Sequence, residues 1–304
     1  MEKPGFRAGY VSVIGRPNVG KSTLINHLMR QKIAAVSPLP QTTRRRQLGI
    51  LTLENAQIVF VDTPGLHIPH HKLGDFMNEE AELSLMDADV ILWLLDASEL
   101  PTEEDHLIAK RLGNLRRCPP TLLGVNKIDR LSPSDLPERE KAMHALFPQA
   151  KAFSISASTG NGVEPLLQAL LAHLPEGHPF FDEDQVTDFY ERDIAADLIR
   201  EACMLYLKKE VPHCVAIRID SYTERGEDGA LIAATIFVER DSQKGIVIGR
   251  GGEMLKQIGM TARKEIEAMS GRKVYLELRV KVNSNWRNNP DALRLLGFVE
   301  TRER

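Results

Sequence analysis

The sequence predicts an α/β protein in which a mostly parallel sheet, covered by helices on both faces, is followed by a smaller α+β unit. Three observations support this. Short apolar runs alternate with helix-like segments in the first half of the 304 residues, the stretch PEGHPFFDED interrupts the alternation, and two strands then follow in succession. Buried parallel strands need helical crossovers, so the alternation indicates a parallel sheet. We expect a first domain at residues 1–175, a linker at 176–188 and a second domain at 189–304.

In the first half, apolar runs bounded by polar turns predict strands, and apolar residues at helical spacing predict helices. The expected strands cover residues 10–14, 57–62, 90–96, 121–126 and 153–156. The expected helices cover residues 21–29, 103–112, 138–146 and 163–173. The segment around residues 41–44 has no clear periodicity and carries no predicted element.

The second half predicts the order helix, strand, strand, helix, glycine loop, helix, strand. The proline, glycine and acidic residues of PEGHPFFDED are typical of a linker. Beyond it come a helix at 189–209, strands at 214–222 and 230–240, the run 246–248, the loop 249–252, a helix to about 269 and a strand at 273–282.

Composition excludes several classes of protein. With 42% hydrophobic and 27% charged residues the chain can bury sizeable cores. The three cysteines, Cys118, Cys203 and Cys214, lack CxxC spacing, which argues against a disulfide framework and favours a reducing compartment. No apolar run approaches the roughly 18 residues of a spanning helix. We therefore expect a cytoplasmic protein.

A phosphate-binding loop is predicted between the first strand and the first helix. The run GRPNVGKS matches GxxxxGK[ST] and comprises Gly15, Arg16, Pro17, Asn18, Val19, Gly20, Lys21 and Ser22, followed by Thr23. Its glycines let backbone N–H groups turn toward one centre, and the helix N-terminus adds positive potential. Lys21 is expected at the β- and γ-phosphates and the Ser22 hydroxyl at Mg²⁺.

Two further segments are expected near the metal and the γ-phosphate. Asp62 ends a strand and can hold Mg²⁺ through water, while the N–H of Gly65 in DTPG can sense the γ-phosphate. In the segment QTTR, a threonine could close on Mg²⁺ when the γ-phosphate is present; Thr42 and Thr43 are both candidates, and Thr43 is our choice. The histidines of HIPHH lack helical context, so we expect a loop there and no metal site.

The base is expected to be guanine because of the run NKID. Asp129 can accept hydrogen bonds from N1–H and the exocyclic amine of guanine, a donor pair that adenine lacks. Asn126 and Lys127 precede it and are included in the predicted site. Ser156 and Ala157, which the prediction places at the end of the next strand, could offer a backbone N–H to the base oxygen.

The near-neutral total charge of −3 conceals a basic segment in the second half. Residues 182–239 hold 14 acidic and 6 basic side chains, whereas residues 240–290 hold 5 acidic and 11 basic ones. A GxxG loop in the basic segment would let an RNA backbone approach closely, and the preceding strands would supply an apolar groove for unstacked bases. The candidate RNA-binding residues are Lys244, Ile248, Gly249, Arg250, Gly251, Gly252, Lys256 and Arg263, with Lys264 as a further phosphate contact.

These motifs in this order resemble the Era branch of the translation-factor-related P-loop GTPases, in which a GTPase domain precedes a type II KH domain. The resemblance covers about residues 8–299. Leu66 follows DTPG here, in place of the glutamine that orients water in Ras-like enzymes. Asn18 matches the position that helps hold K⁺ in potassium-activated members. Catalytic roles are therefore expected for Asn18, Lys21, Thr43 and Gly65, with GTP or GDP, Mg²⁺ and, as a further candidate, K⁺ bound.

The resemblance also implies partners. It implies binding to the 3′ end of small-subunit (16S) ribosomal RNA, a role in assembly of the 30S subunit, a monomer, and peripheral contact with the inner membrane. The alternative is a GTPase switch whose second domain docks on a protein or membrane surface, with GxxG as a tight turn only. Loss of RNA binding without loss of GTP turnover in Gly249 and Gly252 variants would distinguish the two.

Overall fold

The computed structural model describes residues 5–37, 39, 42–66, 69, 71–226 and 229–298. The described residues form two compact units, one within 1–34, 43–68 and 77–188 and the other within 35–42, 69–76 and 189–304. The sequence predicts a single boundary near residue 188; it does not predict that two short segments of the first half belong with the second unit.

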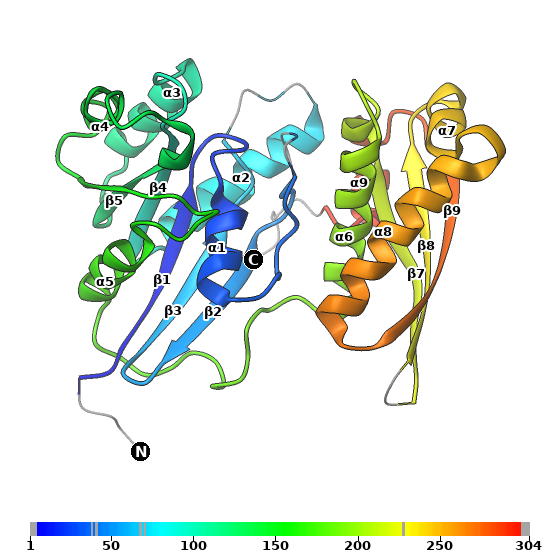
Figure 1. Cartoon of the computed structure of the whole chain (residues 1–304), viewed down its shortest axis with the longest axis horizontal. Helices are drawn as coiled ribbons and strands as arrows, with labels where there is room; N and C mark the ends of the chain where they lie inside the picture. The colour runs from blue at the N-terminus through cyan, green and yellow to red at the C-terminus, as the bar shows by residue number, and fades with distance from the viewer. Residues whose placement is uncertain are drawn as a thin grey trace. The chain divides into compact units, whose positions relative to one another are not determined.

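The first unit is an α/β sandwich around one six-stranded sheet with the order β2-β3-β1-β4-β5-β6 (Figure 1). All pairings are parallel except that of β2 with β3. The strands are β1 Arg7–Ile14, β2 Gln47–Leu53, β3 Ala56–Asp62, β4 Val90–Asp96, β5 Thr121–Asn126 and β6 Lys151–Ser154. The helices are α1 Lys21–Met29, α2 Lys72–Met86, α3 Glu103–Gly113, α4 Leu136–His144 and α5 Val163–His173.

Both faces of this sheet are buried, which is why its strands are continuous apolar runs. Leu92 and Leu94 of β4 pack on one face with residues of α1 and α5. Ile91, Trp93 and Leu95 pack on the other face with residues of α2, α3 and α4. Alternate residues of one strand therefore enter two different cores, as expected for a parallel sheet between helical layers. The predicted P-loop fold of this half is confirmed.

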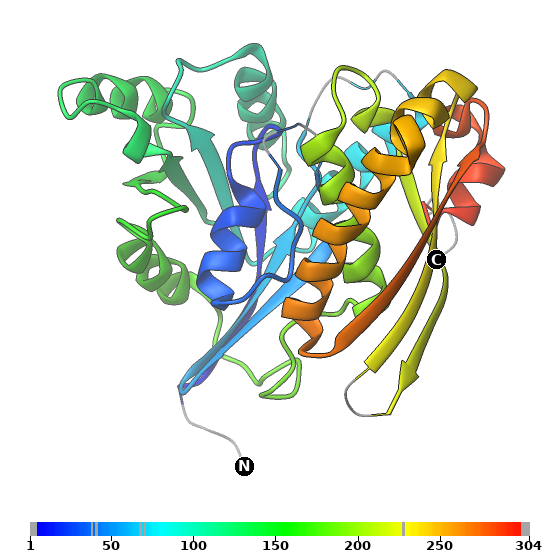
Figure 2. The ribbon, with the colours of Figure 1, turned by 45° about the vertical axis from the view of Figure 1, so that its right-hand side comes forward.

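The second unit is an α+β layer with the sheet order β7-β8-β9 (Figure 2). β7 Ala216–Arg225 pairs antiparallel with β8 Gly229–Val238, and β8 pairs parallel with β9 Lys273–Val282. The helices are α6 Glu191–Tyr206, α7 Asp241–Ile248, α8 Glu253–Ser270 and α9 Pro290–Leu295. Apolar residues of α6, α7 and α8 share one core with the sheet. The predicted type II KH order is confirmed.

Three of the named elements, β2, α2 and α9, are absent from the sequence-based prediction. β2 contains Gly49, and a Cβ there would come within 2.9 Å of Ile25 Cγ2, so α1 packs closely on this strand. α2 contains Gly74 and begins directly after the histidine-rich run. In β2 and α2 a single glycine weakens the local signal but does not remove it, since α2 is otherwise rich in strong helix formers and β2 in apolar residues.

Candidate nucleotide and RNA sites

The phosphate-binding loop joins β1 to α1 at the edge where the parallel strands end. Gly20 adopts φ +104°, and a Cβ on it would lie 2.3 Å from Asn126 Nδ2, so this position accepts no larger residue. Asn18 also has a positive φ of 64°. The loop thus turns its backbone toward the N-terminus of α1, where an anion is favoured.

Lys21 is buried at the first position of α1. Its Nζ donates hydrogen bonds to the carbonyl oxygens of Gly15 and Arg16, each at 3.1 Å. Burial lowers the pKa of Lys21 to about 8, and the Asp62 carboxylate opposes that shift. The ammonium is therefore held by weak acceptors, and phosphate oxygens would be stronger partners.

Three side-chain oxygens meet next to this lysine. Ser22 Oγ donates to Asp62 Oδ2 at 2.7 Å and lies 3.0 Å from Thr43 Oγ1, which is 3.2 Å from the same carboxylate oxygen. Two hydroxyls and a carboxylate are hard oxygen ligands of the kind Mg²⁺ prefers. Thr42 instead directs its hydroxyl to the Leu39 carbonyl at 3.0 Å. Of the two threonines, only Thr43 contributes its hydroxyl to this cluster.

The residues after Asp62 lie against the phosphate-binding loop. A Cβ on Gly65 would come within 2.6 Å of Pro17 N, so the two loops are in close backbone contact. Leu66 is 1% exposed and belongs to the core shared with Trp93. Its side chain is fixed by packing and cannot orient a water molecule. Gln41, His67 and His70, which the sequence analysis considered, lie outside the described residues.

Asn126 ties the base-reading loops to the phosphate loop. Its Nδ2 donates to the carbonyl of Val19 at 2.7 Å, and its Oδ1 accepts from Ala157 N at 2.9 Å. Asp129 Oδ1 accepts a hydrogen bond from Ser156 Oγ at 2.6 Å. The strand β6 ends at Ser154, two residues earlier than predicted, so Ser156 and Ala157 lie in the loop beyond it.

A charged network that the sequence analysis missed supports these loops. Lys127, at φ +67°, forms an ion pair with Asp96. Burial opposes ionisation of Asp96, but hydrogen bonds from Lys127 and Ser98 outweigh it and hold the pKa of that carboxyl below its usual range. Arg16 reaches the same carboxylate at 3.8 Å and Asp105 at 3.4 Å. Asp96 ends β4, and its position at the strand edge is the signal that could have identified it.

In the second unit, the GxxG loop joins α7 to α8. Gly249, Gly251 and Gly252 all have positive φ, between 62° and 83°. A Cβ on Gly249 would lie 2.9 Å from the backbone N of Met254, so the turn needs glycine there. Arg250 is exposed within the turn, whereas Ile248 is half-buried against the core.

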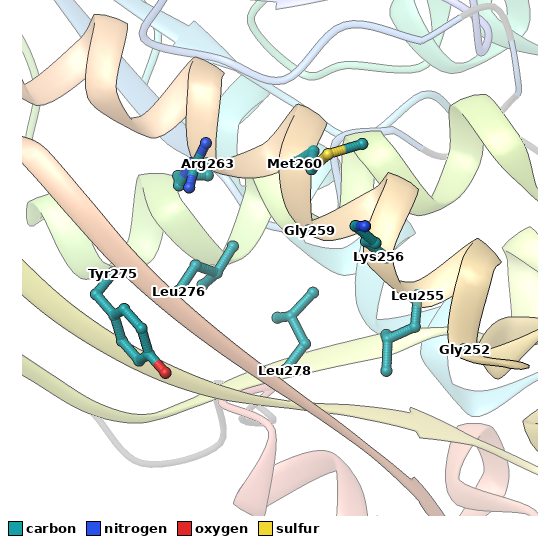
Figure 3. Close-up of a pocket in the computed structure, with 9 residues that line it drawn as sticks. All are labelled: Gly252, Leu255, Lys256, Gly259, Met260, Arg263, Tyr275, Leu276 and Leu278. Atoms are coloured by element: carbon teal, nitrogen blue, oxygen red, sulfur yellow. The ribbon is translucent and has the colours of Figure 1, made fainter.

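A groove of about 400 Å³ runs between α8 and β9 (Figure 3). It is lined by Gly252, Leu255, Lys256, Gly259, Met260, Arg263, Tyr275, Leu276 and Leu278. Three predicted RNA-binding residues, Gly252, Lys256 and Arg263, are thus together, and Lys244 and Arg250 do not line it. The apolar groove expected on the strands before the GxxG loop lies instead on β9, which follows α8, and the alternation of β9 could have revealed Leu276 and Leu278.

No helix among the described residues is long and apolar enough to cross a membrane. No group of three or more His, Cys, Asp or Glu side chains there could hold a metal ion. The oxygen cluster near Lys21 is of a different kind, because it contains two hydroxyls and only one carboxylate.

Known proteins match both halves of the chain. A family model described as a 50S ribosome-binding GTPase matches residues 10–127, and a KH-domain model matches residues 210–287. GTPase Era of Lactobacillus helveticus (strain DPC 4571) is 44% identical over 298 residues, which is 98% of each chain.

Two solved structures match with a TM-score of 0.92 and 39% identity, over 97% of this chain and 100% of theirs. One is the crystal structure of Era in complex with MgGDPNP and nucleotides 1506–1542 of 16S ribosomal RNA. The other is the crystal structure of an Aquifex aeolicus Era variant bound to GDP and AlF₄⁻.

Proposed function

The chain belongs to the Era family of GTPases, and from this premise we propose that it binds GTP with Mg²⁺, hydrolyses it, and binds small-subunit ribosomal RNA near its 3′ end. The observation that carries the nucleotide part is the convergence of Ser22, Thr43 and Asp62 oxygens beside Lys21. The RNA part rests on the GxxG turn and the adjoining groove with its cations.

We assign the phosphates to the backbone N–H groups of the loop and to Lys21. The residues in this part of the site are Gly15, Asn18, Val19, Gly20, Lys21, Ser22 and Thr23. Mg²⁺ would be held by Ser22 and Thr43, with Asp62 acting directly or through water. At these residues Mg²⁺ would supply positive charge that offsets the negative charge of the phosphates. Gly65, in close contact with Pro17, would donate its N–H to the γ-phosphate.

Guanine would be read by Asp129, with Asn126 and Lys127 framing the base. The Ser156 hydroxyl holds the Asp129 carboxylate. Ala157 N already donates to Asn126 Oδ1, so that N–H is engaged in fixing the loop. Another backbone N–H of the same loop would then donate a hydrogen bond to the base oxygen. This refines the role proposed for Ser156 and Ala157.

Hydrolysis in this chain needs a device other than a glutamine, because Leu66 is buried. We propose that K⁺, held with the help of Asn18 in the phosphate loop, neutralises charge between the phosphates during transfer. GTP turnover should be at least about tenfold faster in K⁺ than in Na⁺ at equal ionic strength, and Asn18→Ala should remove the difference. Equal rates in the two salts would reject this part of the proposal.

We further propose that the RNA-bound protein assists 30S assembly as a cytoplasmic monomer, with peripheral contact at the inner membrane. Free Cys118, Cys203 and Cys214 fit a reducing compartment. The assembly role and the membrane contact rest on the family. A 30S precursor that accumulates on depletion of the protein would support the first, and recovery in washed membranes would support the second.

The decisive experiment separates RNA binding from GTP turnover. The paired changes Gly249→Asp and Gly252→Asp place two carboxylates in the turn that faces RNA phosphates. We expect RNA affinity to fall at least about 100-fold, and wild-type affinity itself to fall steeply with added salt. Loss of RNA binding with a turnover equal to wild type supports the proposal. Full RNA binding in the variant would instead favour a docking module in which GxxG is only a turn.

A further inference from the structure

Asp96 ends β4 at a point between the two loops that are assigned to the nucleotide. β4 lies between β1 and β5 in the sheet. Ile14, the last residue of β1, pairs with Trp93, so β4 continues past the end of β1 toward the phosphate loop. On its other side Asp96 pairs with Asn126, the first residue of NKID. A side chain at this strand end can therefore reach both loops.

The carboxylate of Asp96 does reach both loops, and it does so with one oxygen. Oδ2 accepts a hydrogen bond from Nζ of Lys127 in NKID at 2.5 Å, and Nη2 of Arg16 in the phosphate loop lies 3.8 Å from it. The other oxygen, Oδ1, accepts from the backbone N of Ser98 at 3.0 Å and from the Ser98 hydroxyl at 2.5 Å. Cations from two loops thus meet at one carboxylate, whose orientation Ser98 fixes.

The two cations differ in how far they depend on Asp96. Arg16 also forms ion pairs with Glu99 and Asp105. Among the described residues, Asp96 is the only carboxylate that pairs with Lys127. Lys127 also holds a left-handed backbone conformation, φ +67°, which is strained for a residue with a side chain. Loss of the charge on Asp96 should therefore release Lys127 and leave Arg16 in place.

Stability alone does not explain this ion pair. Asp96 is 5% exposed and the Lys127 side chain 18% exposed, so both charges are largely withdrawn from water. The desolvation cost of such a pair offsets most of its Coulomb attraction, so its net contribution to folding is small. What the pair does supply is a direction, since it holds the flexible lysine stem stretched from the base loop toward the phosphate loop. A nucleotide with its base at Asp129 and its phosphates in the loop spans the same distance.

We infer that Asp96 is a positioning residue for the guanine nucleotide, because it holds the Lys127 side chain along the nucleoside, where the aliphatic stem packs against it. The inference rests on the proposed nucleotide binding and adds a residue that lies outside the phosphate and guanine motifs. The charge of Asp96 by itself would oppose binding, since a carboxylate near the phosphate loop repels an anionic ligand. Positioning and repulsion therefore predict opposite results when that charge is removed.

The substitution Asp96→Asn in the full chain separates the two effects. With its oxygen on the two Ser98 donors, the new amide would turn its NH₂ toward the Lys127 ammonium, donor against donor. We expect GDP affinity, measured by titration calorimetry, to fall at least about tenfold. Unchanged or tighter GDP binding would mean that Asp96 acts only as a repulsive charge, and the inference would be wrong.

The substitution Lys127→Met tests whether Asp96 acts through the lysine. It keeps an apolar stem, removes the ammonium, and should weaken GDP binding about as much as Asp96→Asn does. In the Lys127→Met background, Asp96→Asn should then cost less than about twofold, because the interaction is already lost. An equal cost of Asp96→Asn in both backgrounds would assign Asp96 to the architecture of the strand end and overturn the inference.

Glu99→Gln is the matched control, since it removes a carboxylate from Arg16 that does not pair with Lys127. The Glu99 side chain is 51% exposed, so GDP affinity should stay within about twofold of the wild-type value. A loss as large as that of Asp96→Asn would show that the effect runs through Arg16 and would reject the role of Lys127.

Thermal melting of each variant separates positioning from folding. If Asp96→Asn melts below the assay temperature, Asp96 belongs to the fold and the inference is overturned. If it melts well above that temperature, the change in GDP affinity is a property of the folded site. A wild type that binds no GDP would reject the proposed function itself, whereas wild-type binding with an unaffected Asp96→Asn variant rejects only the role of Asp96.

Discussion

Asn126 shows how one side chain can position two loops that are far apart in sequence. Its amide group donates to Val19 in the phosphate loop and accepts from Ala157 in the base loop. Only an amide offers both a donor and an acceptor at this size. An aspartate in its place would leave the Val19 carbonyl without this donor, at a cost of about 1–3 kcal/mol.

We propose that base selection depends on Asp129. Asp129→Asn would replace an acceptor-only carboxylate by an amide, which cannot accept from both guanine donors. We expect affinity for GDP to fall at least about 100-fold. The affinities are measured by displacing bound fluorescent GDP with unlabelled GDP and, separately, with xanthosine diphosphate. Xanthine carries an oxygen where guanine has its amine, so xanthosine diphosphate should now compete better; unchanged GDP affinity would contradict the assignment.

Lys21 gives the site a pH dependence. Its pKa is lowered to about 8 by burial, so it loses its proton as the pH rises through 8, and phosphate binding above that pH requires proton uptake. GDP affinity should therefore be nearly level up to pH 7.5 and fall roughly tenfold by pH 9. Lys21→Arg, which stays charged, should bind more weakly but with a level profile. A level wild-type profile would show that the lysine is already fully charged at pH 9.

At the scale of elements, the site is built from the carboxyl ends of parallel strands. β1 leads into the phosphate loop, β3 ends in Asp62 and β5 ends in Asn126, so this loop and two polar residues lie at one sheet edge. Ligands bind at this edge in open α/β sheets, because helix N-termini and loops converge there. The strands and motifs were predictable from sequence, since their apolar runs are local signals.

The packing of the segment after β9 depends on the buried indole ring of Trp286. Trp286 is fully buried, stacks with Phe298 at a centroid distance of 6.3 Å, and donates from Nε1 to the Cys214 carbonyl at 2.9 Å. Trp286→Ala should destabilise the second unit by about 3–5 kcal/mol, measured as lost hydrogen-exchange protection in β8. Leu205→Ala, at a position 58% exposed, should cost less than about 0.5 kcal/mol. Equal losses would show that Trp286 is not a packing anchor.

At the scale of the whole molecule, the near-neutral net charge of −3 conceals an acidic segment and a basic segment. The acidic segment from residue 189 to 239 and the whole basic segment 240–290 belong to the second unit, and only the basic one carries the GxxG turn and both groove cations. Segments 35–42 and 69–76, on either side of the Mg²⁺ and γ-phosphate residues, are grouped with that unit. Nucleotide-dependent ordering of the flanking loops could therefore bias RNA binding.

We expect RNA to bind at least about fivefold more tightly to the protein with a GTP analogue than with GDP. Titration of labelled RNA in the two states measures it. By thermodynamic reciprocity, RNA should raise affinity for the GTP analogue, relative to GDP, by the same factor, which gives an independent control. Equal RNA affinities in the two states would mean that the nucleotide does not control RNA binding.

The sequence alone determined the two folds, the phosphate and guanine motifs and the GxxG turn, because each is a local pattern read over a few consecutive residues. Tertiary structure decided the rest. It placed Thr43 and not Thr42 beside Ser22, and it buried Leu66. It also opened a groove at Gly259, because side chains far apart in sequence meet only once the core has packed.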